Sequence, residues 1–283
     1  MIQPAFNIGN TDTTPLSGNA DLLIEVSAQS LNYILYEKDP HALLLLRQYR
    51  LYTTGDRSSR DLIDEVIEED PLIQQHLGNA LVVYNFPEAN IVPAELYKKE
   101  INSSITRLMH GDRNHEFVFG EQIRDLGMHN VYSVPQDIHS LLKEKFKGSR
   151  YWHIYTLLLL APGSLQIEKN NIIKTVFYHD KFIAAFYSSE KLQLIQTFNY
   201  QTPEDVAYYL LLICKQFDIP QQQMVLSVSG LIDSQSALYS ELVKYFPEVY
   251  EEEIPQGIEV NGLLGEFPAH YFSPLLKMSL CGL

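Results

Sequence analysis

Cysteine is scarce in this sequence, with only Cys214 and Cys281 among 283 residues. So few thiols argue against a disulfide framework and against a zinc site built from cysteines. Cys214 lies inside an apolar periodic segment and Cys281 lies next to the end of the chain. We therefore expect both to be ordinary free thiols in a reducing cytoplasm.

Long hydrophobic runs are also missing. The longest, Leu43–Leu46 and Leu157–Pro162, fall far short of the ~20 residues that a helix needs to cross a bilayer. The first residues have neither the basic region nor the apolar core of a signal peptide. These absences predict a soluble, cytoplasmic protein with no membrane insertion.

Basic residues are also few compared with acidic ones. The sequence contains 21 Lys and Arg against 35 Asp and Glu, which gives a formal net charge of −14. A chain this acidic repels the phosphate backbone of DNA or RNA, so we expect no nucleic-acid partner. The 46% hydrophobic content is enough to fill the core of one large domain or two ordinary ones.

One order of strands and helices occurs twice along the chain. In the first half, three β-rich runs separated by short turn segments predict an antiparallel meander. Ser58 and Asp61 predict the capped start of a helix, and Pro71 predicts its end. The elements expected in this half are strands at 21–28, 31–37 and 42–52, a helix from 58, a buried strand at 80–86, a helix at 95–109 and a strand at 130–134.

The second half repeats most of this order. Its clearest helix start is Thr202, because Pro203 occupies the first helical position and Asp205 the third. The elements expected here are strands at 172–178, 182–188 and 192–198, a helix from 202, a buried strand at 224–228 and a helix at 234–246. Two copies of one topological unit predict two lobes that face a cleft.

The expected domain boundaries follow from this repeat. Residues 1–20 are polar and rich in turn formers, so we expect a flexible N-terminal segment. A buried helix at 151–160 is expected between the copies. The first lobe then covers residues 21–162, and the second covers 163–283 with a C-terminal extension. Periodicity is weak after Ile254, where we expect the chain to return over a sheet edge.

The order β-β-β-α-β-α-β, present twice, resembles the ribonuclease H-like unit of the actin-like ATPase superfold. More narrowly, the stretch 194–205 with Tyr208 and Tyr209, and the segment Leu226–Gly230, resemble an uncharacterised bacterial family of unknown function assigned to that fold. The resemblance implies a two-lobed α/β fold with mixed sheets flanked by helices. It implies no activity, because none is established for the family and a fold does not confer function.

Active members of this superfold hold the phosphates on glycine-containing turns, which let backbone amides approach the ligand. Here the first-lobe turn keeps the carboxylate of Glu25 but has no glycine, and the second-lobe turn is crowded by aromatic residues. The glycine pair expected to contact adenosine is reduced to Gly230. The residues of this candidate degenerate nucleotide cleft are Glu25, Ser27, Asp180, Ser229 and Gly230. For Gly230 the competing interpretation is a helix-entry turn, and for Glu25 a solvated or capped strand residue.

Possible metal ligands are densest at His110, Asp112, His115 and Glu116. Their spacing matches neither a helical zinc motif nor a calcium loop, so a solvated loop is favoured. The sequence also lacks the glycine motifs of serine hydrolases, Walker proteins and Rossmann proteins. We expect no metal, no catalytic residues and no resident cofactor.

Three functions remain open at this stage. The leading hypothesis is a non-catalytic, actin-like scaffold that binds another protein. One alternative is an atypical nucleotide-binding ATPase or kinase that uses ATP with Mg²⁺ in the interlobe cleft. The other is a module that binds a small molecule or a peptide in that cleft.

Overall fold

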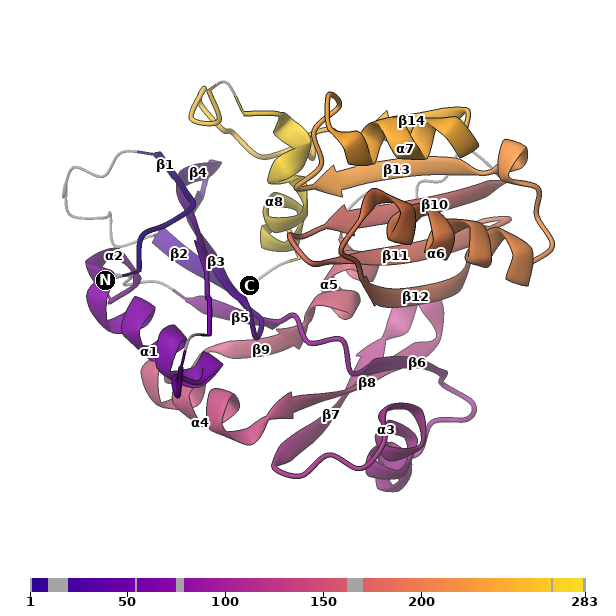
Figure 1. The fold of residues 1–283 in the computed structure, drawn as a ribbon. Coiled ribbons are helices and arrows are strands. Elements are labelled where there is room, and N and C mark those ends of the chain that lie inside the picture. Colours follow the sequence, from indigo (N-terminus) through magenta and orange to yellow (C-terminus); the bar gives the residue numbers. More distant parts are fainter. Residues whose placement is uncertain are drawn as a thin grey trace. The chain divides into compact units, whose positions relative to one another are not determined.

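The computed structural model describes residues 2–9, 20–53, 55–74, 79–161, 170–265 and 267–281. These residues form two compact units, each with its own sheet (Figure 1). Unit 1 contains the described residues up to Leu160, together with Gly257–Gly265 and Cys281, and unit 2 contains those from Ala161 to Gln256 and from 267 to Leu280. The expected lobe boundary at residue 162 lies outside the described residues.

A six-stranded mixed sheet forms the centre of unit 1, in the order β1-β4-β3-β2-β5-β9. Its first three long strands make the predicted antiparallel meander, and β5 and β9 then add to β2 in parallel. The strands are β1 (Phe6–Gly9), β2 (Ala20–Val26), β3 (Ser30–Lys38), β4 (His41–Arg50), β5 (Ala80–Tyr84) and β9 (Arg150–His153). Every residue of β2 and β5 is buried, as expected for central parallel strands covered on both faces.

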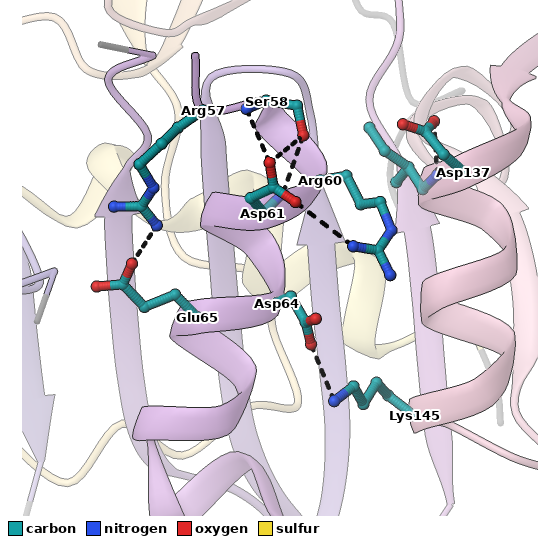
Figure 2. A network of polar contacts seen from close by, with 9 residues as sticks. Arg57, Ser58, Arg60, Asp61, Asp64, Glu65, Asp137 and Lys145 are labelled. Atoms are coloured by element: carbon teal, nitrogen blue, oxygen red, sulfur yellow. Dashed lines mark hydrogen bonds and ion pairs between the residues drawn. The ribbon is translucent and has the colours of Figure 1, made fainter. Parts of the chain in front are cut away.

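Helix α1 (Ser59–Glu69) begins where the sequence predicts. The Ser58 hydroxyl accepts the Asp61 N–H at 3.2 Å, and the Asp61 carboxylate accepts the Ser58 N–H at 3.1 Å (Figure 2). The helix ends at Glu69, and the short α2 (Pro71–Gln74) follows. On its outer side, α1 is joined to α4 (Gln136–Lys145) by an ion pair of 2.9 Å between Asp64 and Lys145.

Unit 1 also carries a second sheet that sequence periodicity did not predict. It has three antiparallel strands in the order β6-β8-β7, with α3 (Asn102–His110) packed against them. The strands are β6 (Ala89–Pro93), β7 (Glu116–Ile123) and β8 (Met128–Pro135). The strand expected at 130–134 is therefore part of this inserted sheet, and the helix expected at 95–109 begins only at Asn102.

The prediction of a helix over 151–160 is wrong for the first three residues. Arg150–His153 forms β9, which pairs in parallel with β5, and α5 (Ile154–Leu160) starts only after it. Likewise, Phe6–Gly9 lies within the segment expected to be flexible but forms β1 beside β4. Pairing with a strand distant in the sequence decides both cases, and local periodicity carries no information about it.

Unit 2 is built on a five-stranded mixed sheet in the order β12-β11-β10-β13-β14. Its strands are β10 (Asn171–Phe177), β11 (Lys181–Ser188), β12 (Lys191–Asn199), β13 (Val225–Gly230) and β14 (Glu248–Glu251). Its helices are α6 (Pro203–Gln216), α7 (Ala237–Tyr245) and α8 (Ser273–Ser279). Helix α6 has the predicted capping box of Thr202 and Asp205, and its apolar face contributes Val206 and Leu210 to the core.

The two sheets repeat one topology. In both units an antiparallel meander is followed by two strands that pair in parallel next to its first strand. Even the irregularities agree, because the second and third strands shift register between Leu35/Tyr36 in unit 1 and between Phe186/Tyr187 in unit 2. Each strand of the unit 2 sheet thus has a counterpart in unit 1, which adds β1 at one edge and a second sheet.

The segment after residue 254 is divided between the units. Glu259 forms a parallel bridge with Ala42 of β4, so residues 257–265 cover the end of that strand in unit 1. Helix α8 packs in unit 2, where most of its residues are buried. A return of the chain to a sheet edge is what we expected from the sequence.

Candidate functional site

The turn between β2 and β3 is closed by its own side chains. The Ser27 N–H donates to the Ser30 carbonyl at 2.9 Å. The Ser27 hydroxyl oxygen accepts the backbone N–H groups of Gln29 at 3.2 Å and of Ser30 at 3.0 Å. In phosphate-binding turns such amides point at the ligand. Here the buried Ser27 hydroxyl occupies the position of the acceptor.

Glu25, the candidate acid beside this turn, is not a solvated strand residue. Its side chain lies inside unit 1 with 1% of the residue exposed, and its Oε1 accepts the Asn85 side-chain amide at 2.7 Å. Asn85 directly follows β5, and its backbone N–H donates to the Val26 carbonyl at 2.8 Å. The carboxylate therefore ties together the ends of two parallel strands.

In unit 2 the equivalent turn is closed by backbone and aromatic contacts. The Tyr178 N–H donates to the Lys181 carbonyl at 2.8 Å, and the Tyr200 hydroxyl donates to the Tyr178 carbonyl at 2.6 Å. The Asp180 carbonyl accepts the Tyr200 N–H at 2.9 Å. Asp180 itself is half-buried, while the Lys181 ammonium lies 5.4 Å from the centre of the Tyr178 ring. The aromatic residues that the sequence indicated do line this turn.

Gly230 is required by close backbone packing. It ends β13 opposite Phe177 with a φ of +76°, and a Cβ atom built on it would lie 2.2 Å from the Phe177 carbonyl oxygen. Helix α7 begins only at Ala237, so the helix-entry interpretation of Gly230 is wrong. The neighbouring Ser229 hydroxyl donates to the Thr175 carbonyl at 2.8 Å. The bare backbone of Gly230 faces the chain's own β10.

The five candidate residues thus fall into two groups. Glu25 and Ser27 lie at the end of β2 in unit 1. Asp180, Ser229 and Gly230 lie near the ends of β10 and β13 in unit 2. All five direct a polar or backbone group into internal contacts, Asp180 through its backbone carbonyl. Nucleotide binding at these residues stays a prediction.

The possible metal ligands at positions 110–116 do not converge on one point. His110 Nε2 lies 3.0 Å from the side-chain amide of Asn90. Arg113 forms ion pairs with Glu88 at 2.8 Å and with Glu116 at 3.3 Å, so two carboxylates there are already neutralised. Within the ranges that the structure describes, no group of three or more His, Cys, Asp or Glu side chains is arranged to hold a metal.

A buried carboxylate at the end of α1 was not singled out from the sequence. Asp70 accepts hydrogen bonds of 2.7 Å each from the hydroxyls of Tyr33 and Tyr49 and from the Arg47 guanidinium, and a fourth of 3.1 Å from the Leu72 N–H. Burial, followed by the nearby Asp70 charge, raises the pKa of Tyr33 far above its usual range. The phenols therefore stay protonated and donate. Asp70 is a structural anchor with every lone pair used.

A cavity of about 180 Å³ lies beside this anchor, between the N-terminal residues and α1. Its polar lining includes Asn7, Arg47 and Glu69, together with Asp70. Sites for drug-sized ligands usually measure about 300–1,000 Å³ and are mostly apolar. The Arg47 charge is already neutralised by Asp70. This cavity therefore gives little support to a small-molecule site.

A second buried cluster joins the inserted sheet to the main sheet. Glu121 of β7 accepts the Tyr132 hydroxyl of β8 and the backbone N–H of His153 of β9, the latter at 3.0 Å. Burial raises the pKa of the Glu121 carboxyl to about 7, although hydrogen bonds from Thr156 and Tyr132 lower it. This cluster could not be predicted from the sequence, because strand β7 itself was not predicted.

His153 in this cluster is held as a neutral ring. Its Nε2 lies 2.9 Å from the Phe86 carbonyl, which can only accept, and its Nδ1 accepts the Tyr155 N–H at 3.1 Å. One nitrogen therefore carries the proton and the other carries a lone pair. Both are occupied by backbone groups of the same unit, so the ring positions the chain and is not free for proton transfer.

Solved structures share this fold. A Bacteroides thetaiotaomicron protein, described as having an actin-like ATPase fold and unknown function, is 18% identical to this chain, with a TM-score of 0.78 over 96% of this chain and 99% of its own. A chain of the PilM-PilN type IV pilus biogenesis complex is 11% identical, with a TM-score of 0.61 over 92% of this chain and 98% of its own. At such identities these likenesses show the fold alone, and that fold is the predicted actin-like one.

Among curated protein sequences, none is similar enough to match this chain. Across the described residues, each helix is too short or too polar to cross a membrane.

The sequence model of one family covers most of the chain. It is described as a protein of unknown function, DUF3822, and it matches residues 10–249. The matched region includes both segments in which the sequence resembled an uncharacterised family of actin-like fold, between residue 194 and Gly230. This chain belongs to the DUF3822 family.

Proposed function

We propose that this protein is a non-catalytic, actin-like scaffold that acts by binding another protein. The observation that carries the proposal is the turn between β2 and β3, where the Ser27 hydroxyl accepts the amides of Gln29 and Ser30. A phosphate group would have to displace this hydroxyl, which is buried and lies 2.8 Å from the Ser30 hydroxyl. Without glycine, the turn also has a Cβ atom on every residue that a phosphate would approach.

The equivalent turn of unit 2 supports the same proposal. Its carbonyl groups at Tyr178 and Asp180 both accept hydrogen bonds from Tyr200. Tyr178 and Tyr200, both half-buried, are also far bulkier than the small residues of a phosphate-binding turn. Closure of both turns in one chain favours a role that does not depend on nucleotide chemistry.

The choice of a protein as the partner is supported by one neighbour in fold. The PilM-PilN structure is a complex of type IV pilus biogenesis, so one protein of this fold is found assembled with another protein. The net charge of −14 disfavours nucleic acid as the alternative macromolecule.

Thermal-shift titration with Mg-ATP and with Mg-GTP tests this proposal. A ligand at about one hundred times its Kd stabilises a protein by ~2.7 kcal/mol, which is easily measured. We expect no change in melting temperature up to millimolar nucleotide. A clear, dose-dependent rise with either nucleotide would overturn the proposal in favour of the nucleotide-binding alternative.

The variant that locates such a site should be chosen at Asp180. Gly230 is unsuitable, because any larger residue there collides with the Phe177 backbone and disturbs the fold. Asp180→Asn keeps the shape of a half-buried turn residue and removes only its charge. If nucleotide raised the melting temperature of the wild type and not of Asp180→Asn, the ligand would lie at the unit 2 turn.

A further inference from the structure

A lysine side chain lies on the face of the unit 2 sheet that is opposite α6 and α7. Along β10, Ile173 and Phe177 belong to the apolar core that those two helices cover, so the alternation of the strand points Lys174 to the other face. The strand neighbours of Lys174 are Ala185 of β11 and Ser227 of β13, which are both small. Lys174 is half-buried, and its strand neighbours leave space beside its amine.

The surroundings of the Lys174 amine are aromatic and charged. Its Nζ lies 5.8 Å from the centre of the ring of Tyr187, a buried residue of β11. Lys277 of α8 forms an ion pair with Glu252, and the side chains of this pair are only 15% and 16% exposed. Glu252 also accepts the Ser273 hydroxyl at 2.9 Å. Two ammonium groups thus share one carboxylate at a place with little water.

These surroundings disfavour the charged form of Lys174. Burial, followed by the neighbouring Lys277 charge, lowers the pKa of the amine to about 8, although the Glu252 charge raises it. The Tyr187 phenol adds no charge, because burial raises its pKa far above the usual range. An ordinary lysine titrates near about 10.4 and is almost fully protonated at neutral pH. Lys174 therefore presents far more of the unprotonated, nucleophilic amine.

We propose that Lys174 is a modification site, at which small acyl phosphates acylate the amine without a separate enzyme. The amine lone pair attacks the carbonyl carbon of the donor. The C–N bond forms, the C–O bond to phosphate breaks, and the amine proton leaves with the phosphate as hydrogen phosphate. This inference goes beyond the scaffold role and does not depend on it.

The size and charge of the site favour this class of donor. The amine is half-buried beside Tyr187 and Lys277, so a donor of few atoms reaches it more easily than a bulky one. Two ammonium groups beside one carboxylate also attract a dianion such as an acyl phosphate.

Acylation changes the charge next to α8. The amide that forms is neutral, so Lys277 loses a repelling neighbour and keeps its ion pair with Glu252. The modification therefore couples the packing of α8 to the supply of acyl phosphates.

Labelling of the purified full chain with acetyl phosphate, followed by mass spectrometry of its peptides, tests the inference. Lys191 is the matched control, because it is exposed on β12 of the same sheet. At about pH 7.5 we expect acetylation of Lys174 to be about tenfold faster or more, since a larger share of its amine is unprotonated. The rate at Lys174 should level off above about pH 8, whereas the rate at Lys191 should still rise near about pH 10.

Two variants separate the effect of charge from a loosening of α8. Lys277→Met removes the repelling charge and leaves Glu252 to Lys174, so labelling at about pH 7 should fall by about threefold or more. Glu252→Gln removes the attracting charge, so labelling should rise by about twofold or more. A loosened helix would instead expose Lys174 in both variants and raise both rates. Lys215→Met, at an exposed position on α6, is the control and should change the rate by less than about twofold.

Other results would overturn the inference. These are equal rates at Lys174 and Lys191, a Lys174 rate that rises steadily to about pH 10, or rate changes of the same sign in Lys277→Met and Glu252→Gln. A second labelling reaction uses an S-acetyl thioester as the donor. Acetylation by the thioester and not by acetyl phosphate would reject the proposed donor class. None of these results bears on the scaffold role, which the nucleotide titration tests separately.

Discussion

At the scale of single residues, Ser27 closes a turn of the kind that binds phosphate in active members of this fold, while the turn itself is kept. Ser27 accepts two backbone amides, those of exposed Gln29 and half-buried Ser30. An intramolecular hydrogen bond contributes about 0.5–1.5 kcal/mol net, so the hydroxyl stabilises the hairpin as it blocks it. The same residue therefore serves folding and, in our proposal, prevents phosphate binding.

Ser27→Ala should lower the free energy of unfolding by about 1–2 kcal/mol, because the amides of Gln29 and Ser30 lose their acceptor. Urea denaturation measures the change. Gln29→Ala is the matched control, since its side chain is exposed on the same turn, and it should stay within about 0.5 kcal/mol of the wild type. Equal midpoints for the two variants would show that the Ser27 hydroxyl has no structural role.

Gly230→Ala should be far more destabilising than its small size suggests. The new Cβ would lie 2.2 Å from the Phe177 carbonyl oxygen, in addition to the strain of a positive φ. Gly148→Ala is the control, because its φ of +82° is similar but nothing lies within 4 Å of the new Cβ. We expect Gly148→Ala to lower the free energy of unfolding by about 1–2 kcal/mol from strain alone. Gly230→Ala should lower it by at least twice as much, as measured by thermal unfolding. Equal losses would mean that β10 moves aside freely.

At the scale of elements, the inserted sheet is joined to the main sheet by the Glu121 cluster. The carboxyl is enclosed between β7, β8 and β9, and its ionised form is disfavoured there. The folded state consequently binds this proton more tightly than the unfolded chain, whose glutamates titrate near the usual 4.5. We therefore expect the attachment of the sheet to depend on pH.

The sign of the pH dependence follows from the raised pKa. The stabilising contribution of protonated Glu121 is complete below about pH 4.5 and is lost as the pH rises through about 7. Unfolding free energy should fall between pH 5 and pH 8 by up to about 3 kcal/mol from this group. Glu121→Gln should flatten that part of the curve, whereas Glu95→Gln, at an exposed position, should leave it unchanged. Parallel curves for Glu121→Gln and the wild type would contradict the prediction.

At the scale of the whole molecule, the chain completes unit 1 only after it has built most of unit 2. The Glu259 N–H donates to the His41 carbonyl and the Glu259 carbonyl accepts the Leu43 N–H, both at 2.8 Å. Unit 1 is therefore discontinuous in sequence, and its stability depends on a segment more than two hundred residues downstream of β4.

Glu259→Pro should destabilise unit 1 by about 1–3 kcal/mol, because proline removes the N–H that donates to His41. The single tryptophan, Trp152 on β9, reports the unfolding of unit 1 by fluorescence. Glu259→Ala keeps the backbone donor and should behave like the wild type. A fluorescence transition unchanged in Glu259→Pro would show that this bridge contributes nothing.

The sequence alone determined the repeated meander, the capped helices and the loss of turn glycines. All of these depend on residues close together in the chain, such as Ser58 with Asp61 or Thr202 with Asp205. The duplicated actin-like fold could be predicted for the same reason. Only the tertiary structure decided how the candidate residues are used, because Glu25 meets Asn85 and Gly230 meets Phe177 across strands far apart in sequence.

The inserted sheet, β9 and the outward face of α3 also escaped prediction. Strand pairing and burial depend on which distant segment lies opposite, and local periodicity does not encode that choice. The apolar stripe of α3 is visible in the sequence, but periodicity would place Leu108 in a core. Only the packing of Asn102 and Thr106 against the sheet turned that stripe towards solvent.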